Sequence, residues 1–218
     1  MQPLDHSTYL ALREGANVLE ADGSGDKVLQ LRDGRFLKLF RRKRLLTSAA
    51  LYPYAQRFAD NTKALQERDI PCPDILAVYR IASIERDAVY YEPLAGDTVR
   101  HLIDQPELAA VLRIRLGGFV AQLHDAGVYF RSLHLGNVVI TPEQRLGLID
   151  IADLKCQRSP LTIRRRLRNF RHLMRYEQDY RWLLGDDGGK TFLAAYQAAL
   201  APRSSRPGMM ERLQELFC

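Results

Sequence analysis

The stretch LHDAGVYFRSLHLGNVVITPEQRLGLID, which runs from Leu123 to Asp150, carries the clearest structural signals in this chain of 218 residues. It begins where a long helical pattern ends, and Gly127 stands where a glycine commonly follows the last turn of a helix. A loop comes next, and two short apolar runs at 138–140 and 146–149 then flank a turn at 142–144. The stretch therefore predicts a helix end, a loop and a β-hairpin.

Two polar side chains stand at the ends of this predicted hairpin. Asn137 precedes the first strand and Asp150 follows the second, so the hairpin should bring them close together. Amide and carboxylate oxygens are ligands that Mg²⁺ accepts in proteins. Asn and Asp are also common turn residues, which is the alternative interpretation. The long helix upstream and the loop His134-Leu135-Gly136-Asn137 favour the metal site.

A second hairpin is predicted nearer the N-terminus. Strands at 28–31 and 36–40 flank Arg32-Asp33-Gly34-Arg35, which carries the Asp-Gly signature of a tight turn. Upstream, a flexible loop contains Gly23 and Gly25. This loop precedes a strand rather than a helix, which disfavours a P-loop or a dinucleotide-binding fingerprint.

Lys38 lies in the middle of the second of these strands, within the run FLKLF. A charged side chain among apolar residues is costly unless it is paired or liganded. One interpretation is a contact between Lys38 and phosphate. The other is an edge strand on which Lys38 faces solvent.

The remaining patterns differ on the two sides of residue 94. Before it, one helix is predicted from a mostly apolar stripe at helical spacing, formed by Leu51, Ala55, Phe58, Thr62 and Leu65. Strands are predicted at 75–81 and 88–92, and helices at 98–103, at 108–126 and from 161 onward. The sequence thus predicts an α+β fold with an antiparallel-sheet part at 1–94 and a mainly helical part at 95–218.

Composition and charge exclude several classes of protein. The chain is 46% hydrophobic and 27% charged, which is typical of globular proteins, and its apolar runs are shorter than the roughly 20 residues that span a bilayer. The N-terminal residues lack the pattern of a signal peptide, and three cysteines without metal-ligand spacing indicate reduced thiols. We therefore expect a cytoplasmic protein. The net charge of +6 favours an anionic partner.

The order and spacing of these motifs resemble a known family. Leu123–Asp150 is similar to small bacterial kinases of the protein-kinase-like fold, notably the lipopolysaccharide core kinases that act on Kdo or heptose, including relatives labelled toluene-tolerance proteins. His134-Leu135-Gly136-Asn137 also resembles the His-Pro-Gly-Asn of aminoglycoside and choline kinases. The interval of thirteen residues from Asn137 to Asp150 equals the one between the loop Asn and the metal-binding Asp of typical kinases. The resemblance covers roughly residues 22–175.

This resemblance implies a two-lobed fold that binds ATP and Mg²⁺ and transfers phosphate to a sugar hydroxyl. Gly23 and Gly25 would form the glycine loop, Lys38 would contact the phosphates, and Tyr91-Glu92-Pro93-Leu94 would be the hinge that holds adenine. The metal ligands implied are Asn137 and Asp150, and the catalytic residues implied are Ser132, His134 and Asp150.

The chain departs from the family pattern at several positions. Ser132 stands in place of the catalytic Asp and Phe130 in place of a His, Asp150-Ile151-Ala152 lacks the usual glycine, and Phe36 replaces a small residue. The helix residue that should pair with Lys38 is not evident among the three candidates Gln56, Asp60 and Glu67.

Losing a general base costs on the order of 10²–10⁴-fold in rate, while nucleotide binding can persist. Ser132 could still orient a hydroxyl, and His134 or Asp125 could take its proton. The alternative is a catalytically impaired pseudokinase with a scaffold or regulatory role.

The sequence after Asp150 points to the acceptor. Residues 151–160 are too few for a long segment that docks a peptide, which favours a small molecule or a lipid head group. In the helix that follows, an apolar stripe is predicted at Ile163, Leu167, Phe170 and Met174, and a basic stripe at Arg164, Arg168, Arg171 and Arg175. A second basic run is Arg41-Arg42-Lys43-Arg44.

Guanidinium groups suit phosphate, so we expect these arginines to bind an anionic sugar or glycolipid, or the inner-membrane surface. A solvated helix face is the alternative. Nucleic acid is a competing partner, but the chain carries no helix-turn-helix, zinc-ligand or aromatic RNA-binding pattern. No nucleic-acid partner is therefore expected.

Overall fold

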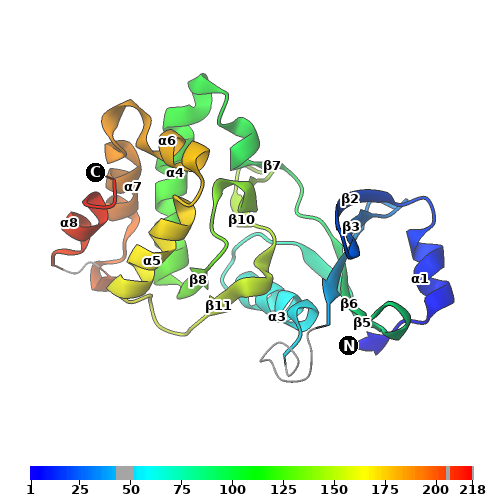
Figure 1. The fold of residues 1–218 in the computed structure, drawn as a ribbon. Helices are drawn as coiled ribbons and strands as arrows, with labels where there is room; N and C mark the ends of the chain where they lie inside the picture. The colour runs from blue at the N-terminus through cyan, green and yellow to red at the C-terminus, as the bar shows by residue number, and fades with distance from the viewer. Residues whose placement is uncertain (43–51, 205–206, 218) are drawn as a thin grey trace. The chain divides into compact units, whose positions relative to one another are not determined.

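The computed structural model of the chain describes residues 1–42, 52–204 and 207–217. The chain divides into two units, Met1–Leu94 and Ala95–Cys218 (Figure 1). An antiparallel-dominated sheet forms most of the first unit, and helices form most of the second. The predicted α+β class is confirmed.

The first unit is built on a six-stranded sheet with the order β1-β5-β6-β4-β3-β2, in which only the pairing of β1 with β5 is parallel. Its strands are β1 (Gln2–Pro3), β2 (Asn17–Asp22), β3 (Gly25–Gln30), β4 (Phe36–Arg41), β5 (Asp74–Ile81) and β6 (Arg86–Glu92). Its helices are α1 (His6–Arg13) and α3 (Tyr54–Gln66).

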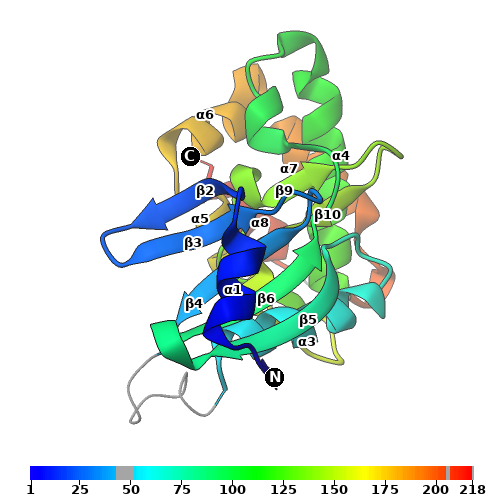
Figure 2. The same ribbon diagram turned by 90° about the vertical axis from the view of Figure 1, so that its right-hand side faces the viewer.

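Alternation along β4 gives the sheet two apolar faces. Leu37 and Leu39 are buried in a core cluster that includes Tyr9 of α1. On the other face, the ring of Phe40 lies 6.4 Å from that of Phe58 in α3. The two helices therefore cover opposite faces of one sheet (Figure 2).

The predicted strands and the Asp-Gly turn of this unit are confirmed, with strand ends shifted by up to three residues. The predicted stripe of α3 is confirmed at Ala55, Phe58, Thr62 and Leu65, whereas Leu51 lies outside the described residues. Helix α1 was not predicted. Its sequence signal is Asp5, whose carboxylate accepts a hydrogen bond from Thr8 N at 2.9 Å and caps the helix.

The second unit surrounds a long helix, α4, with shorter elements. Its helices are α4 (Pro106–Asp125), α5 (Ile163–Leu173), α6 (Glu177–Leu184), α7 (Lys190–Ala199) and α8 (Met209–Gln214). Its strands are β7 (Asp97–Thr98), β8 (Val128–Phe130), β9 (Val138–Ile140), β10 (Leu146–Leu148) and β11 (Leu154–Cys156). They form two small sheets, β10-β9-β7 and β11-β8.

Helix α4 packs closely on α7. The four leucine and valine positions predicted for its apolar stripe are buried, namely Leu112, Leu116, Val120 and Leu123. At Gly117 an added Cβ would lie 2.4 Å from Phe192 O, so only glycine permits this approach. Gly127 has a φ of +74° just after the helix, as its position predicts.

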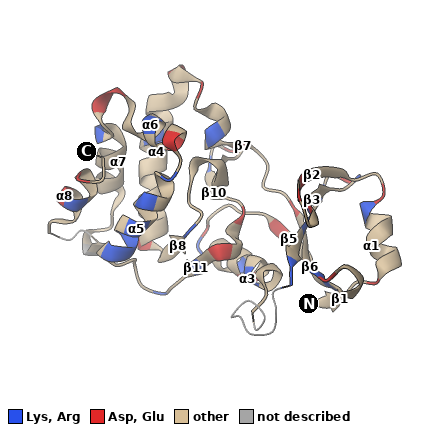
Figure 3. Ribbon diagram, viewed as in Figure 1, with Lys and Arg blue, Asp and Glu red and all other residues tan. Residues whose placement is uncertain are grey.

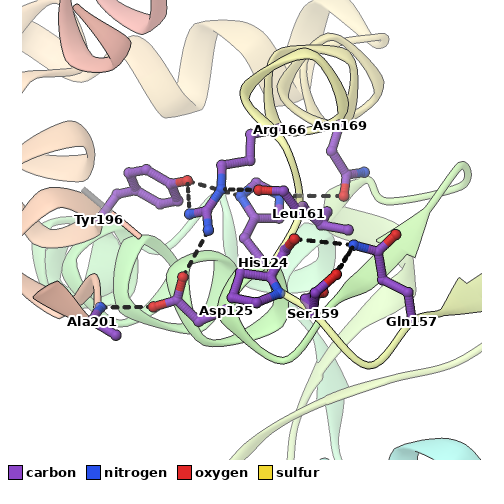
Figure 4. Close-up of polar contacts among 10 residues, drawn as sticks. His124, Asp125, Gln157, Ser159, Leu161, Arg166, Asn169, Tyr196 and Ala201 are labelled. Atoms are coloured by element: carbon purple, nitrogen blue, oxygen red, sulfur yellow. Dashed lines mark hydrogen bonds and ion pairs between the residues drawn. The ribbon is translucent and has the colours of Figure 1, made fainter. Parts of the chain in front are cut away.

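The buried face of α5 differs from the predicted one. Arg166, Asn169, Phe170 and Leu173 are buried, whereas Ile163, Leu167 and Met174 are half-buried. Two polar residues thus replace apolar ones on the inner face, because the remainder of the unit supplies partners for them (Figure 4).

Arg166 is the centre of this buried polar network, with 1% of its surface exposed. Its Nη2 lies 2.8 Å from Asp125 Oδ1, its Nη1 donates to Tyr196 Oη at 3.0 Å, and its Nε donates to Leu161 O at 2.9 Å (Figure 4). Asp125 also accepts from Ala201 N at 2.7 Å. The charge is therefore paired and hydrogen-bonded, which is the condition for burying it.

His124 and Asn169 extend the network to the loop after β8. Asn169 Nδ2 donates to Phe130 O at 2.6 Å, so its Oδ1 is left as the acceptor for His124 Nε2 at 3.3 Å. The other ring nitrogen, Nδ1, lies 2.9 Å from Tyr196 Oη. A buried amide of α5 thus fixes the carbonyl of Phe130, the last residue before the loop.

Replacing Arg166 should destabilise the protein strongly. Arg166→Leu leaves the carboxylate of Asp125 without its cation, and breaking a buried pair from one side costs roughly 3–5 kcal/mol. The matched control is Arg168→Leu, which removes an exposed arginine of the same helix and should change the free energy of unfolding by less than about 0.5 kcal/mol. Urea unfolding at pH 7 measures both, and equal losses would contradict the assigned role of Arg166.

The stability of the protein should fall on mild acidification because of His124. Burial, helped by the charge of Arg166, lowers the pKa of His124 to about 3, while an unfolded histidine has a pKa of about 6.5. The unfolded chain therefore takes up the proton first, and stability declines as the pH drops from about 6.5 toward 3.

The burial of His134 and His172 also lowers their pKa values and acts in the same direction. The contribution of His124 is isolated by comparing wild type with His124→Gln in urea unfolding between pH 6 and pH 5. The slope of stability against pH should be smaller in the variant by roughly 1 kcal/mol per pH unit, about one proton. Parallel slopes would show that His124 titrates normally.

Candidate functional site

The loop between β8 and β9 brings together most of the residues singled out in the second unit. Strands β8 and β11 are antiparallel, with Phe130 opposite Leu154. The residues just after Phe130 and just before Leu154 therefore leave the ladder at the same end. As a result Ser132 Oγ donates a hydrogen bond to Asp153 Oδ2 at 2.8 Å.

Asn137 is fixed at the other end of this loop. Its side chain is 7% exposed, and its Nδ2 donates to Ser132 O at 2.9 Å. This bond uses the nitrogen end of the amide, so Oδ1 is the atom that suits a metal ion. The backbone of Asn137 also receives a bond from Ile149 N at 3.1 Å, which continues the β9–β10 ladder by one residue.

Asp150 follows directly after this last bonded residue. It is exposed, and its φ of +52° lies in the left-handed region, which is uncommon for a residue other than glycine although Asp tolerates it better than most. Such a backbone outlier motivates a functional hypothesis. Ile149, the residue opposite Asn137, thus directly precedes Asp150 in the chain.

His134 lies within the loop, beside the guanidinium group of Arg100. Its Nδ1 is 3.4 Å from Arg100 Nη2, and its ring meets that of Tyr176 edge-on at 5.1 Å. Burial and the charge of Arg100 lower the pKa of His134. The imidazole is therefore neutral near pH 7, and its Nδ1 faces a donor.

Arg100 and Asp179 hold this loop, and sequence reasoning missed both. Asp179 is fully buried and accepts from Arg100 Nε at 3.0 Å, from Arg100 Nη2 at 2.6 Å and from Leu135 N at 3.0 Å. At Gly136 an added Cβ would lie 2.9 Å from Arg100 Nη1, which explains the glycine. No spacing signal reveals this pair, because its members are 79 residues apart.

Sequence reasoning also missed Asp153, whose carboxylate accepts the hydrogen bond from Ser132 Oγ. Burial raises the pKa of Asp153, and the neighbouring charge of Asp150 raises it further. Its Oδ1 is buried and accepts no hydrogen bond from any residue that the structure describes. Asp125, considered above as a proton acceptor, is instead bound by Arg166 and Ala201 in the buried network. That expectation was wrong.

The site residues predicted in the first unit lie on its central hairpins. Gly23 lies in the two-residue turn between β2 and β3, Gly25 is the first residue of β3, and an added Cβ at either position would meet no described atom within 4 Å. Lys38 is half-buried, with its Nζ 5.9 Å from the ring centre of Phe40. Since β4 lies between β3 and β6, the alternative that placed Lys38 on an edge strand is wrong.

Glu92 ends β6, and its carboxylate lies 3.2 Å from Arg35 Nη2. Of the helix residues considered as partners for Lys38, Asp60 accepts hydrogen bonds from Tyr52 at 2.5 Å and from Gln56 at 2.9 Å. Glu67 follows the end of α3.

Three residues of the predicted basic stripe lie on α5, and Arg175 lies just beyond its end; blue marks arginine positions along this helix (Figure 3). The members of the stripe, Arg164, Arg168, Arg171 and Arg175, are all exposed. Burial lowers the pKa of His172 on the same helix, and Arg175, Arg168 and Arg131 lower it further. The local potential is therefore positive, as an anion-binding surface requires. Lys43 and Arg44 of the second basic run lie outside the described residues.

The described residues contain no group of three His, Cys, Asp or Glu side chains placed to hold a metal ion. Asn137 and Asp150 would therefore need phosphate or water oxygens to complete a magnesium shell. Among the same residues, no helix combines the length and the hydropathy that crossing a membrane requires.

Comparison with known proteins assigns the chain to no family. No model of a protein family matches the sequence, and no curated protein matches it significantly.

Proposed function

We propose that the protein is an ATP- and Mg²⁺-dependent phosphotransferase with a two-lobed, protein-kinase-like fold, acting on a sugar hydroxyl of lipopolysaccharide core or a related glycolipid. The observation that carries this proposal is the arrangement of the loop and hairpin in the second unit. Asn137 Nδ2 donates to Ser132 O, and Asp150, whose backbone is in the left-handed region, directly follows Ile149, the residue bonded to Asn137 O. Kinases use a loop Asn and a following Asp to hold magnesium.

The donor set fits the proposed metal. A carbonyl oxygen of an amide and an exposed carboxylate are hard ligands, and Mg²⁺ commonly takes only one or two such protein ligands and completes its shell with phosphate and water. When bound, magnesium would neutralise charge on the phosphates of ATP.

The first unit offers residues for the nucleotide. Under the proposal, Lys38 contacts phosphate, the open turn with Gly23 and Gly25 lets backbone approach phosphate, and the chain at Glu92 holds adenine. The support is the half-burial of Lys38 on a central strand together with the open space at both glycines.

The exposed arginines of α5 support an anionic acceptor. The three exposed guanidinium groups on α5 and that of Arg175 just beyond it suit phosphorylated sugars, because each can donate two hydrogen bonds to phosphate. The same surface would favour peripheral contact with an anionic membrane.

A pseudokinase is the second candidate, and Ser132 favours it. At neutral pH its hydroxyl is not a base, and it occupies the position at which the resemblance places the catalytic carboxylate. Such a protein would keep nucleotide binding and use it for regulation.

Nucleotide binding is tested by the melting temperature of the full chain. ATP with Mg²⁺ should raise it, because a ligand that binds only the folded state stabilises that state, by about 2.7 kcal/mol at one hundred times Kd. Asp150→Asn should lose most of the part of the shift that depends on Mg²⁺. Asp186→Asn removes another exposed carboxylate and should keep the shift. A wild type that shows no shift with ATP would exclude both candidates.

The acceptor is tested by transfer of the γ-phosphate of radiolabelled ATP to extracted lipopolysaccharide core lipid. Wild type should label the lipid, and Arg168→Ser with Arg171→Ser should raise the KM for lipid about tenfold or more while changing kcat less, because these groups bind rather than react. Arg181→Ser, on the exposed side of α6, is the matched control. ATP binding without any labelled lipid would favour the pseudokinase.

A further inference from the structure

The hydrogen bond between Ser132 and Asp153 brings a carboxylate to a loop that has no acidic residue of its own at 131–137. Ser132 is a neutral residue at the position where a general base is expected, but its Oγ donates to a carboxylate oxygen 2.8 Å away. Ser132 is half-exposed, so an acceptor hydroxyl can reach it. Asp153 stands behind it, three residues beyond Asp150.

The fold fixes this pair from two directions. On the side of Asp153, β11 starts at the next residue and pairs with β8. On the side of Ser132, Asn137 Nδ2 binds the carbonyl of Ser132, and Asn169 Nδ2 binds that of Phe130. Side chains held by packing and hydrogen bonds are the kind that support proton transfer without reorganisation.

The environment of Asp153 favours uptake of a proton. A buried carboxylate oxygen without a donor is destabilised, and Asp153 Oδ1 accepts no hydrogen bond from the residues described. The charged groups that act on the carboxylate are Arg131 in the loop, Asp150 after the hairpin and Arg175 beyond the end of α5. The arginines lower the pKa of Asp153, whereas burial and Asp150 raise it, and the net effect makes the ionised carboxylate a stronger base than an exposed Asp.

We propose that Asp153 is the base of the reaction and acts through Ser132, which makes Ser132 a proton relay; this inference rests on the proposed phosphotransferase function. The acceptor hydroxyl gives its proton to Ser132 Oγ while the proton of Ser132 passes to Asp153 Oδ2. The acceptor oxygen forms a bond to the γ-phosphorus of ATP, and the bond between that phosphorus and the β,γ-bridging oxygen breaks, so that ADP leaves. Ser132 is the residue that contacts the acceptor hydroxyl, and Asp153 acts through Ser132 by accepting its proton.

The test compares phosphoryl transfer from radiolabelled ATP, to core lipid and to water, between pH 4.5 and pH 8. In wild type the rate should rise with pH through a pKa above the roughly 3.9 of an ordinary Asp, because the ionised form is the base. Asp153→Asn should lower the rate by on the order of 10²-fold and remove this acid limb. Ser132→Ala should do the same.

A double variant tests whether Asp153 acts as a base or has only a structural role. Ser132→Asp placed in the Asp153→Asn background returns a carboxylate to the loop and should restore most of the rate. Asp186→Asn, an exposed carboxylate outside the site, should keep the wild-type rate and profile. Each variant is also tested for the melting shift with ATP, and Asp153→Asn should keep it.

Several outcomes would overturn the inference while leaving the proposed function in place. Asp153→Asn with the wild-type rate and acid limb is one, and restored structure without restored rate in the rescue variant is another. An inactive wild type that binds ATP and gains turnover with Ser132→Asp would show a pseudokinase, and it would overturn the proposed transferase activity together with the inference. Absence of any ATP-dependent shift likewise removes the proposed function itself and the inference with it.

A measurement without nucleotide tests the pair directly. Because the hydrogen bond from Ser132 lowers the pKa of Asp153 against the effect of burial, Ser132→Ala should raise that pKa further. Titration of the carboxyl carbon by NMR measures it in both proteins. Identical titration would show that no such bond exists in solution and would overturn the inference.

Discussion

The second unit depends on one buried cation. An arginine side chain stays charged in proteins, so Arg166 can be buried only where fixed partners are always present. Its donors reach Asp125 at the end of α4, Tyr196 in α7 and Leu161 just before α5. Because loss of any partner would leave an unpaired group in the interior, the network sets how these helices approach one another. Packing of α4 on α7 through Gly117 then becomes possible at short range.

The same network also fixes the start of the loop of the candidate site. Asn169 shares the buried face of α5 with Arg166, and it binds the carbonyl of the residue that precedes the loop. Asp179 holds the loop further along through Leu135 N, and Asn137 closes it onto Ser132. A loop without long regular structure is thus fixed at three points by side chains that are themselves buried.

Local patterns predicted the hairpins, the long helices and the neighbourhood of Asn137 and Asp150, because each depends on residues close in sequence. They failed where a contact joins distant residues. The inner face of α5 was predicted wrongly because arginine is a polar residue, and Arg166 can be buried only through partners such as Asp125, 41 residues away, and Tyr196, 30 residues away. Asp153 escaped notice for a similar reason. It carries no motif, and the pairing of β11 with β8 alone brings it to Ser132.

A serine at position 132, where the resemblance places an acidic residue, has two physical consequences that differ in sign. A neutral side chain would repel the phosphates of the proposed nucleotide less than a carboxylate would. The serine also leaves Asp153, one hydrogen bond further back, as the carboxylate in contact with it, in a buried position where a proton is held more tightly. One oxygen of Asp153, Oδ1, is buried without a donor among the described residues, and an apolar residue at position 153 would avoid that cost. The proposed proton transfer gives this buried oxygen a role that the pseudokinase alternative does not.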